Sequence, residues 1–160
     1  MFIRRAAAVV AGCAATLALA VPVTAQAATT GTVDLVRYYN SPASKHYSTT
    51  GQVPGGYKRE GAVTILAQPV RGAIPIYGCM AGGARNDQYI SLHRNCEGAQ
   101  NTFIKLEGYL YANPTGRFTR PIYRCYWAQA QSHFYSIKAD CETTATTKVT
   151  AEGRMGYVLG

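Results

Sequence analysis

Three short landmarks recur in the same order along the chain, and this repetition constrains the fold more than any other feature. Each copy has an apolar segment that ends in tyrosine, then a polar and aromatic segment led by histidine or glutamine, then a Glu-Gly pair. The residues at these positions are Tyr38, His46 and Glu60, then Tyr77, Gln88 and Glu107, then Tyr123, His133 and Glu152. Because one supersecondary unit used three times produces such a pattern, we predict repeats at about 33–71, 72–118 and 119–160.

The cysteines follow the same alignment. Cys79 and Cys125 each lie two residues after the landmark tyrosine, and Cys96 and Cys141 each lie five residues after the serine that ends the second landmark. This correspondence favours the pairs Cys79–Cys96 and Cys125–Cys141, each within one repeat, over the two other connectivities that four cysteines allow. In the first copy the alignment places Asn40 at the position of Cys79, and that repeat has no cysteine.

Short strands are favoured over helices. Segments such as Val63–Leu66, Gly108–Tyr111 and Gly156–Leu159 are β-branched or aromatic and are bounded by Gly, Pro or Asn. One repeat of this length holds three or four strands, and three copies fall below the usual blade count of a propeller. We therefore predict an all-β domain at 28–160, in which three repeats close around a pseudo-threefold axis as in a β-trefoil.

The N-terminus has the features of an export signal. Arg4 and Arg5 precede an uncharged apolar run, and the small-residue triplet Ala25-Gln26-Ala27 predicts cleavage that leaves 28–160. The apolar run is too short for a typical membrane span. An alternative is lipid attachment at Cys13, although the sequence after Cys13 stays apolar. The chain is thus expected to be secreted and extracellular, where an even number of cysteines forms disulfides.

Composition supports a folded extracellular domain. The whole chain has a formal net charge of +8, which becomes +6 when Arg4 and Arg5 are removed, and all twelve tyrosines follow the signal. Such a charge allows an acidic polymer as partner. The basic residues are scattered, however, so specific nucleic-acid binding is not expected.

The chain resembles a family of uncharacterised bacterial secreted domains that repeat Tyr-Arg, then His-Phe-Tyr-Ser/Thr, then Glu-Gly. The third copy matches best, through Tyr123-Arg124, His133 to Ser136 and Glu152-Gly153, and the second departs most, at Gln88. The resemblance covers nearly all of 28–160. It implies an accessory role beside cell-wall or carbohydrate-active proteins.

Catalytic motifs are not evident. His46 and His133 occupy one position in two copies, and Gln88, which cannot act as a general base, fills that position in the other copy. We therefore interpret the nine landmark residues as structural, including Glu60, Glu107 and Glu152. Nucleophile-elbow, zinc-helix and phosphate-loop motifs are absent from the sequence. No enzyme activity, catalytic residue, metal or cofactor is predicted.

Candidate binding residues lie between the first and second landmarks. Aromatic faces bind the C–H surfaces of sugars, and polar side chains bind their hydroxyl groups. The residues that combine these properties are Tyr39, Asn40, Arg85, Asn86, Asp87, Tyr126 and Trp127. Trp127 is the only tryptophan, and packing against the adjacent Cys125 is an equally good explanation for it.

These patterns predict a non-catalytic binding module. The first hypothesis is lectin-like recognition of a glycan or a cell-envelope polymer through loop aromatics. The alternative is a protein partner, as for an adaptor in a secreted toxin or enzyme assembly, or for a protease inhibitor. An inhibitor presents a rigid loop, which the disulfide-closed segments 79–96 and 125–141 could supply.

Overall fold

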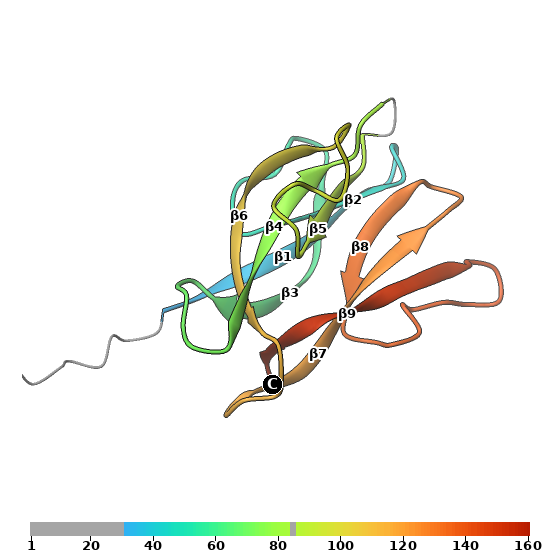
Figure 1. Ribbon diagram of the computed structural model, residues 1–160. Coiled ribbons are helices and arrows are strands. Elements are labelled where there is room, and N and C mark those ends of the chain that lie inside the picture. The colour runs from blue at the N-terminus through green and yellow to red at the C-terminus, as the bar shows by residue number, and fades with distance from the viewer. Residues whose placement is uncertain (1–30, 84–85) are drawn as a thin grey trace, which may run out of the picture.

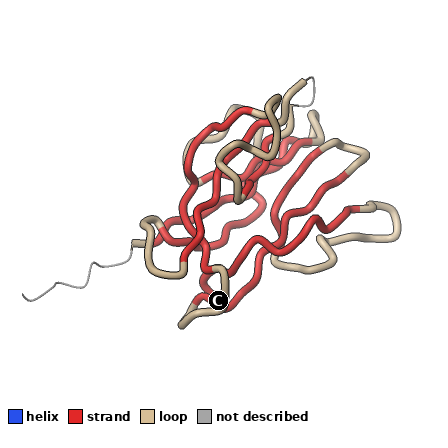
Figure 2. Tube along the Cα trace, viewed as in Figure 1, coloured by secondary structure: helices blue, strands red, loops and turns tan. Residues whose placement is uncertain are grey.

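The computed structural model describes residues 31–83 and 86–160, and this part of the chain is all-β (Figure 1). Strands and connecting loops make up the described ranges, with no helix among them (Figure 2). The strands are β1 (Thr32–Asn40), β2 (Lys45–Thr49), β3 (Lys58–Leu66), β4 (Ala73–Met80), β5 (Gln88–Ser91), β6 (Thr102–Tyr111), β7 (Phe118–Trp127), β8 (Ser132–Ser136) and β9 (Val149–Leu159). The predicted signal at 1–27, with Cys13, lies outside the described residues.

The strands pair in consecutive groups of three. β1 pairs antiparallel with β2 and β3, β4 with β5 and β6, and β7 with β8 and β9. We call these groups the first, second and third units. Single residue pairs join their last strands end to end, Leu66 with Tyr109 between β3 and β6, and Tyr111 with Tyr157 between β6 and β9. The sheet is open.

One core lies between the units. Its fully buried side chains come from the first strand of each unit (β1, β4 and β7) and from the last strand of each unit (β3, β6 and β9). These residues are Leu35, Ile76 and Ile122, and Ile65, Leu110 and Val158. Full burial of such a side chain stabilises the fold by roughly 1.5 to 3 kcal/mol, so this shared core holds the units together.

The edge strands β2, β5 and β8 converge, and side chains satisfy their outer backbone groups. Ser132 Oγ accepts a hydrogen bond from the His46 amide at 2.8 Å, and Asp87 Oδ1 accepts one from the His133 amide at 2.8 Å. Gln88 Oε1 accepts one from the Ser48 amide at 2.6 Å. Each bond joins two different units, so the edges are covered by neighbours.

Two disulfides close the loops that follow β5 and β8. Cys79 is bonded to Cys96 and Cys125 to Cys141, which confirms the predicted connectivity. All four cysteines are fully buried. Because such bridges persist in oxidising compartments, they are consistent with an extracellular setting.

The strand register corrects the alignment of the first unit. Tyr38 pairs with Tyr47, as Cys79 pairs with Tyr89 and Cys125 with Phe134. Tyr38 rather than Asn40 thus occupies the half-cystine position, which a hydrophobic aromatic side chain can also fill. Without a cysteine in the first copy, the sequence alone could not fix this two-residue shift.

The Glu-Gly pair of the second unit also differs in strand register from the Glu-Gly pairs of the other two units. Gly61 and Gly153 pair with Arg37 and Arg124, whereas Gly108 pairs with Ile76, further along its strand. The second unit has Gly78 where the other units have arginine. Glu107 fills the vacant space, since its Oε1 would lie 2.6 Å from a Cβ atom at Gly78.

Gly108 offers a test of this packing. A Cβ atom there would lie 2.6 Å from the Leu66 carbonyl oxygen at a φ of +150°, so Gly108→Ala should lower the free energy of unfolding by roughly 2 to 4 kcal/mol. Gly61→Ala is the control, because nothing lies within 4 Å of its added Cβ. Urea denaturation of the oxidised domain measures both, and equal losses would contradict the packing described.

Candidate functional site

The first strand of the first unit and the first strand of the third unit each carry an arginine that forms ion pairs with two glutamate side chains. Arg37 Nε lies 2.9 Å from Glu60 Oε2 within its own unit, and Arg37 Nη1 donates to Glu142 Oε1 of the third unit at 2.8 Å. Arg37 Nη1 also donates to the Tyr135 carbonyl oxygen at 3.0 Å. Arg37 therefore ties the first unit to the third.

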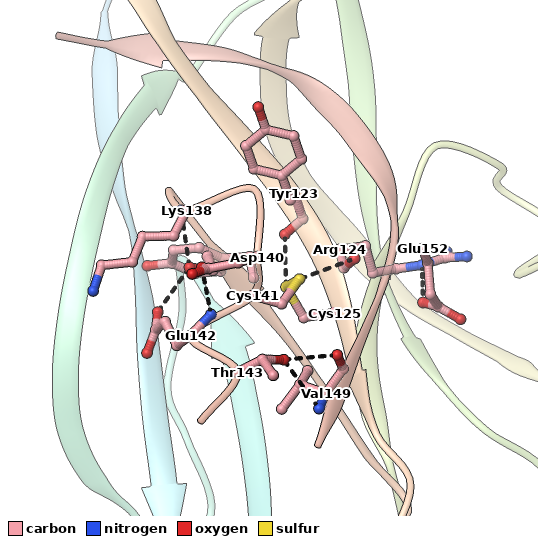
Figure 3. Close-up of a disulfide and its surroundings, with 12 residues drawn as sticks. Tyr123, Arg124, Cys125, Lys138, Asp140, Cys141, Glu142, Thr143, Val149 and Glu152 are labelled. Carbon is pink, nitrogen blue, oxygen red and sulfur yellow. Dashed lines mark hydrogen bonds and ion pairs between the residues drawn. A yellow bond between two sulfur atoms is a disulfide. The ribbon is translucent and has the colours of Figure 1, made fainter. Parts of the chain in front are cut away.

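Arg124 of the third unit makes the same kind of contact with the second unit. Its Nε donates to Glu152 Oε2 at 2.7 Å, and its Nη2 donates to Glu97 Oε2 of the second unit at 3.0 Å. In Figure 3 the Arg124 and Glu152 side chains lie on one side of the Cys125–Cys141 bridge, and Glu142 lies on the other. We call the Arg37–Glu142 and Arg124–Glu97 contacts the arginine clasps.

The disulfides position the carboxylates of the clasps. Glu97 and Glu142 each follow the second cysteine of a bridge, and both residues have positive φ values of 60° and 59°. The hydrogen bond from Arg124 lowers the pKa of Glu97. Burial acts to raise the pKa of Glu142, but the hydrogen bonds from Arg37 and Ser136 outweigh it and lower that pKa.

The second and first units are joined by a carboxylate contact without an arginine. The buried Glu107 accepts hydrogen bonds from the Thr50 amide and hydroxyl groups, both at 2.7 Å, and from the Thr49 hydroxyl. In all three contacts the first or last strand of one unit supplies a side chain that meets the loop after the middle strand, in chain order, of another unit. These strands of the first, third and second units meet the loops of the third, second and first units, respectively.

The two histidines sit at matching positions but differ in protonation. Burial opposes the charge of His133, yet the carboxylates of Asp87 and Glu152 outweigh it and raise its pKa to about 9. Burial and the Arg37 charge lower the pKa of His46 to about 4. His46 instead contacts the neutral Ser132 hydroxyl at 3.2 Å. At neutral pH, His133 is thus charged and His46 neutral.

Aromatic side chains from two units form a pocket beside the Arg37 clasp. The ring of Tyr39 lies 4.8 Å from His46 and 6.5 Å from Trp127, and His46 lies 4.6 Å from Phe134. The pocket has a volume of about 260 Å³. Its wall also includes Arg37, Glu60, Glu142, Thr147 and Val149. We call it the aromatic pocket.

A smaller pocket of about 190 Å³ lies beside the Arg124 clasp. Tyr89 and His133 occupy the positions that Phe134 and His46 hold in the aromatic pocket. Ala81 lies here where Trp127 lies in the aromatic pocket. The smaller pocket thus has polar walls but lacks the large exposed ring.

The structure brings together two of the predicted binding residues, Tyr39 and Trp127, in the aromatic pocket. Tyr126 lies apart from them and packs on His133, with ring centroids 4.5 Å apart. Asn40 caps a turn by accepting a hydrogen bond from the Ala43 amide.

Asn86 and Asp87, two of the remaining predicted residues, directly precede β5. Asn86 is exposed with a φ of 44°, and Arg85 lies outside the described residues. Asp87 is buried and bonded to His133, so its carboxylate supports the fold. No group of three or more His, Cys, Asp or Glu side chains suited to a metal ion occurs in the described ranges.

Sequence reasoning missed Arg37, Glu142 and Thr147 as part of this pocket. The repeated Cys-Glu dipeptide, Cys96-Glu97 and Cys141-Glu142, was a usable signal, because it places a carboxylate next to each bridge. The partner of that carboxylate lies 105 positions away in the chain and has no local signature.

Comparison with protein-family models, curated proteins and solved structures finds no match for this chain. Within 31–83 and 86–160, no helix has the length and apolarity needed to cross a membrane. Interpretation of the site therefore depends on its geometry.

The His133 contacts predict a pH-dependent stability. The pKa of His133 is about 6.5 in the unfolded chain and about 9 in the folded protein. Its contribution to the free energy of unfolding is therefore complete below pH 6.5 and is lost as the pH rises through 9. The loss should be roughly 3 kcal/mol at most. His133→Gln should remove this alkaline slope of the unfolding free energy, measured by urea denaturation between pH 6 and 9.5.

His46→Gln is the matched control, because His46 occupies the same position but is neutral in this range. This variant should keep the alkaline slope. A slope that persists in His133→Gln would show that other groups cause it.

Proposed function

We propose that this chain is a secreted, non-catalytic module that binds carbohydrate through the aromatic pocket. The observation that carries the proposal is the convergence of Tyr39 and Trp127, from different units, on one shallow pocket with charged walls. Both side chains are only half-buried, so their ring faces remain available. Aromatic rings beside convergent polar groups are the usual composition of a small-ligand site.

The polar groups of the pocket suit a sugar. Glu60 and Glu142 both pair with Arg37 and keep lone pairs that can accept hydrogen bonds from hydroxyl groups. The pocket volume of about 260 Å³ lies just below the range of about 300 to 1,000 Å³ for drug-sized ligands, which favours a single sugar unit. An exposed end of a glycan, or one residue of an envelope polymer, fits this size.

We also propose that the three units are copies of one repeat in a β-trefoil-like arrangement. Support comes from the identical strand order of the units and from the mutual contacts of β2, β5 and β8. The one-way ring of inter-unit contacts is a second argument, because a pseudo-threefold axis relates neighbours in that manner. The disulfides support secretion.

A binding role suits the acid–base groups better than catalysis does. His46 has a pKa of about 4 and packs among aromatic rings, and Glu60 is paired with Arg37. A general base that works near neutral pH needs a pKa near that value. The histidine and carboxylate of the pocket therefore fit a positioning role.

Trp127→Ala tests the proposal in a glycan-array and calorimetry experiment on the oxidised domain. Loss of a stacked ring should weaken binding by roughly 1 to 2 kcal/mol, or about five- to thirtyfold. Phe103→Ala is the matched control, because Phe103 is 39 % exposed and lies outside the aromatic pocket. Absence of saturable glycan binding by the parent domain, or equal binding by Trp127→Ala, would refute the proposal.

A protein partner is the second candidate, and one surface favours it. Phe103, Ile104 and Leu106 of β6 are about 40 % exposed, and Phe103 and Leu106 line a cavity of about 360 Å³ with Tyr77 and Tyr109. Clustered exposed apolar side chains are typical of protein contacts. A partner captured from the secreted fraction by the parent domain and by Trp127→Ala, but lost with Leu106→Asp, would favour this function.

A further inference from the structure

A second cavity lies on the other side of the Arg37 clasp. It has a volume of about 280 Å³, and both Arg37 and Glu142 belong to its wall as they do to that of the aromatic pocket. The first unit contributes 61–63 and the third unit contributes Arg120 and 135–138. We infer that this cavity binds an organic anion, through a carboxylate, sulfate or phosphate group held between Arg120 and Lys138.

The charges of the cavity are unbalanced. Arg37 and Glu142 neutralise each other across the unit boundary. Arg120 and Lys138 form no ion pair with any residue that the structure describes. The wall therefore carries an excess of two positive charges, which an anion would compensate.

Arg120 has an unmet bonding requirement in addition to its charge. Its Nε atom is buried and has no hydrogen-bond partner within the described ranges. A guanidinium group stays protonated at all relevant pH values, and burying a charged donor without an acceptor is unfavourable. Arg120 lines the cavity, so an oxyanion there would compensate the guanidinium charge through charge-assisted hydrogen bonds.

Lys138 lies on the wall of the cavity, in the loop that the Cys125–Cys141 disulfide closes. Its backbone amide donates to Ser136 Oγ at 3.0 Å, and Ser136 Oγ donates to Glu142 at 2.8 Å. In Figure 3 the Lys138 side chain lies on the same side of the bridge as Glu142, opposite Arg124. The ammonium group is exposed and so can be recruited by a ligand.

The rest of the wall is apolar and indicates the body of the ligand. Val63 and the 43 % exposed Ile137 lie on it, together with Ala62. A bare inorganic ion would leave these surfaces wet, whereas a ligand with C–H surface would cover them. A sugar acid, a sugar ester or a small carboxylic acid has this composition.

The matching cavity between the third and second units lacks this charge excess. It measures about 180 Å³, and Arg124 and Arg154 face Glu97 and Glu152. Arg124 is paired with both carboxylates. The anion site is therefore specific to the junction of the first and third units.

NMR titration tests the inference, because the Nε–H group of Arg120 gives its own signal. The probes are methyl glucuronide, glucose 6-sulfate and glucose 6-phosphate, with methyl glucoside as the neutral control and inorganic phosphate as the bare anion. A charged probe should shift the Arg120 signal saturably, and methyl glucoside should not. The charged probe that binds best identifies the anionic group.

Variants locate the site. Arg120→Gln, which has no guanidinium signal and is followed through the Lys138 backbone amide instead, should abolish the binding. Lys138→Gln, at an exposed position that folding does not need, should weaken it about tenfold. Arg71→Gln, which removes an exposed arginine outside the cavity, should bind like the parent. Unchanged binding by Lys138→Gln, or no saturable shift with any charged probe, would overturn the inference.

Two further comparisons separate this site from others. Trp127→Ala should leave the anion titration unchanged, since Trp127 belongs only to the aromatic pocket, so the two proposals can fail independently. Inorganic phosphate should bind more weakly than the charged sugars. Equal affinity would overturn the assignment of an organic body.

Discussion

The structure depends on the arginine clasps. Each one joins neighbouring units through a half-buried guanidinium that has carboxylates on two sides, and each carboxylate from the neighbouring unit follows a disulfide-bonded cysteine. Buried ion pairs contribute less to net stability than their Coulomb energy suggests, because both charges lose water. Their hydrogen-bond geometry, however, favours one orientation of each clasped unit against its neighbour. The apolar core alone, made of interchangeable aliphatic side chains, would fix that orientation less sharply.

The clasps also divide the space between units. The Arg37–Glu142 pair separates the aromatic pocket from the cavity of Arg120 and Lys138, so one ion pair forms part of two walls. The second unit has no arginine at this position, and Gly78 and Glu107 occupy the space instead. Loss of the clasp there coincides with exposure of Phe103, Ile104 and Leu106 on β6. Units with the same strand order thus present different surfaces.

The two histidines illustrate how environment decides charge. His133 receives Asp87 and Glu152 as neighbours, whereas His46 receives the Ser132 hydroxyl and the Arg37 guanidinium. Both rings pack against tyrosine side chains, and both backbone amides donate to a side chain of another unit. The same structural role is therefore filled by a cation in one unit and a neutral ring in another.

The sequence by itself determined the all-β class and both disulfide pairs, because strand patterns and cysteine spacing are local signals. It also selected Tyr39 and Trp127 as candidate ligand contacts, although the predicted loop location was wrong, because both residues lie near the ends of strands β1 and β7. Tertiary structure alone decided that Arg37 meets Glu142, that Asp87 is buried against His133, and that Tyr38 holds the half-cystine position. The Arg37–Glu142 and Asp87–His133 contacts span 105 and 46 positions of the chain, and the place of Tyr38 depends on strand register. No local pattern encodes these outcomes.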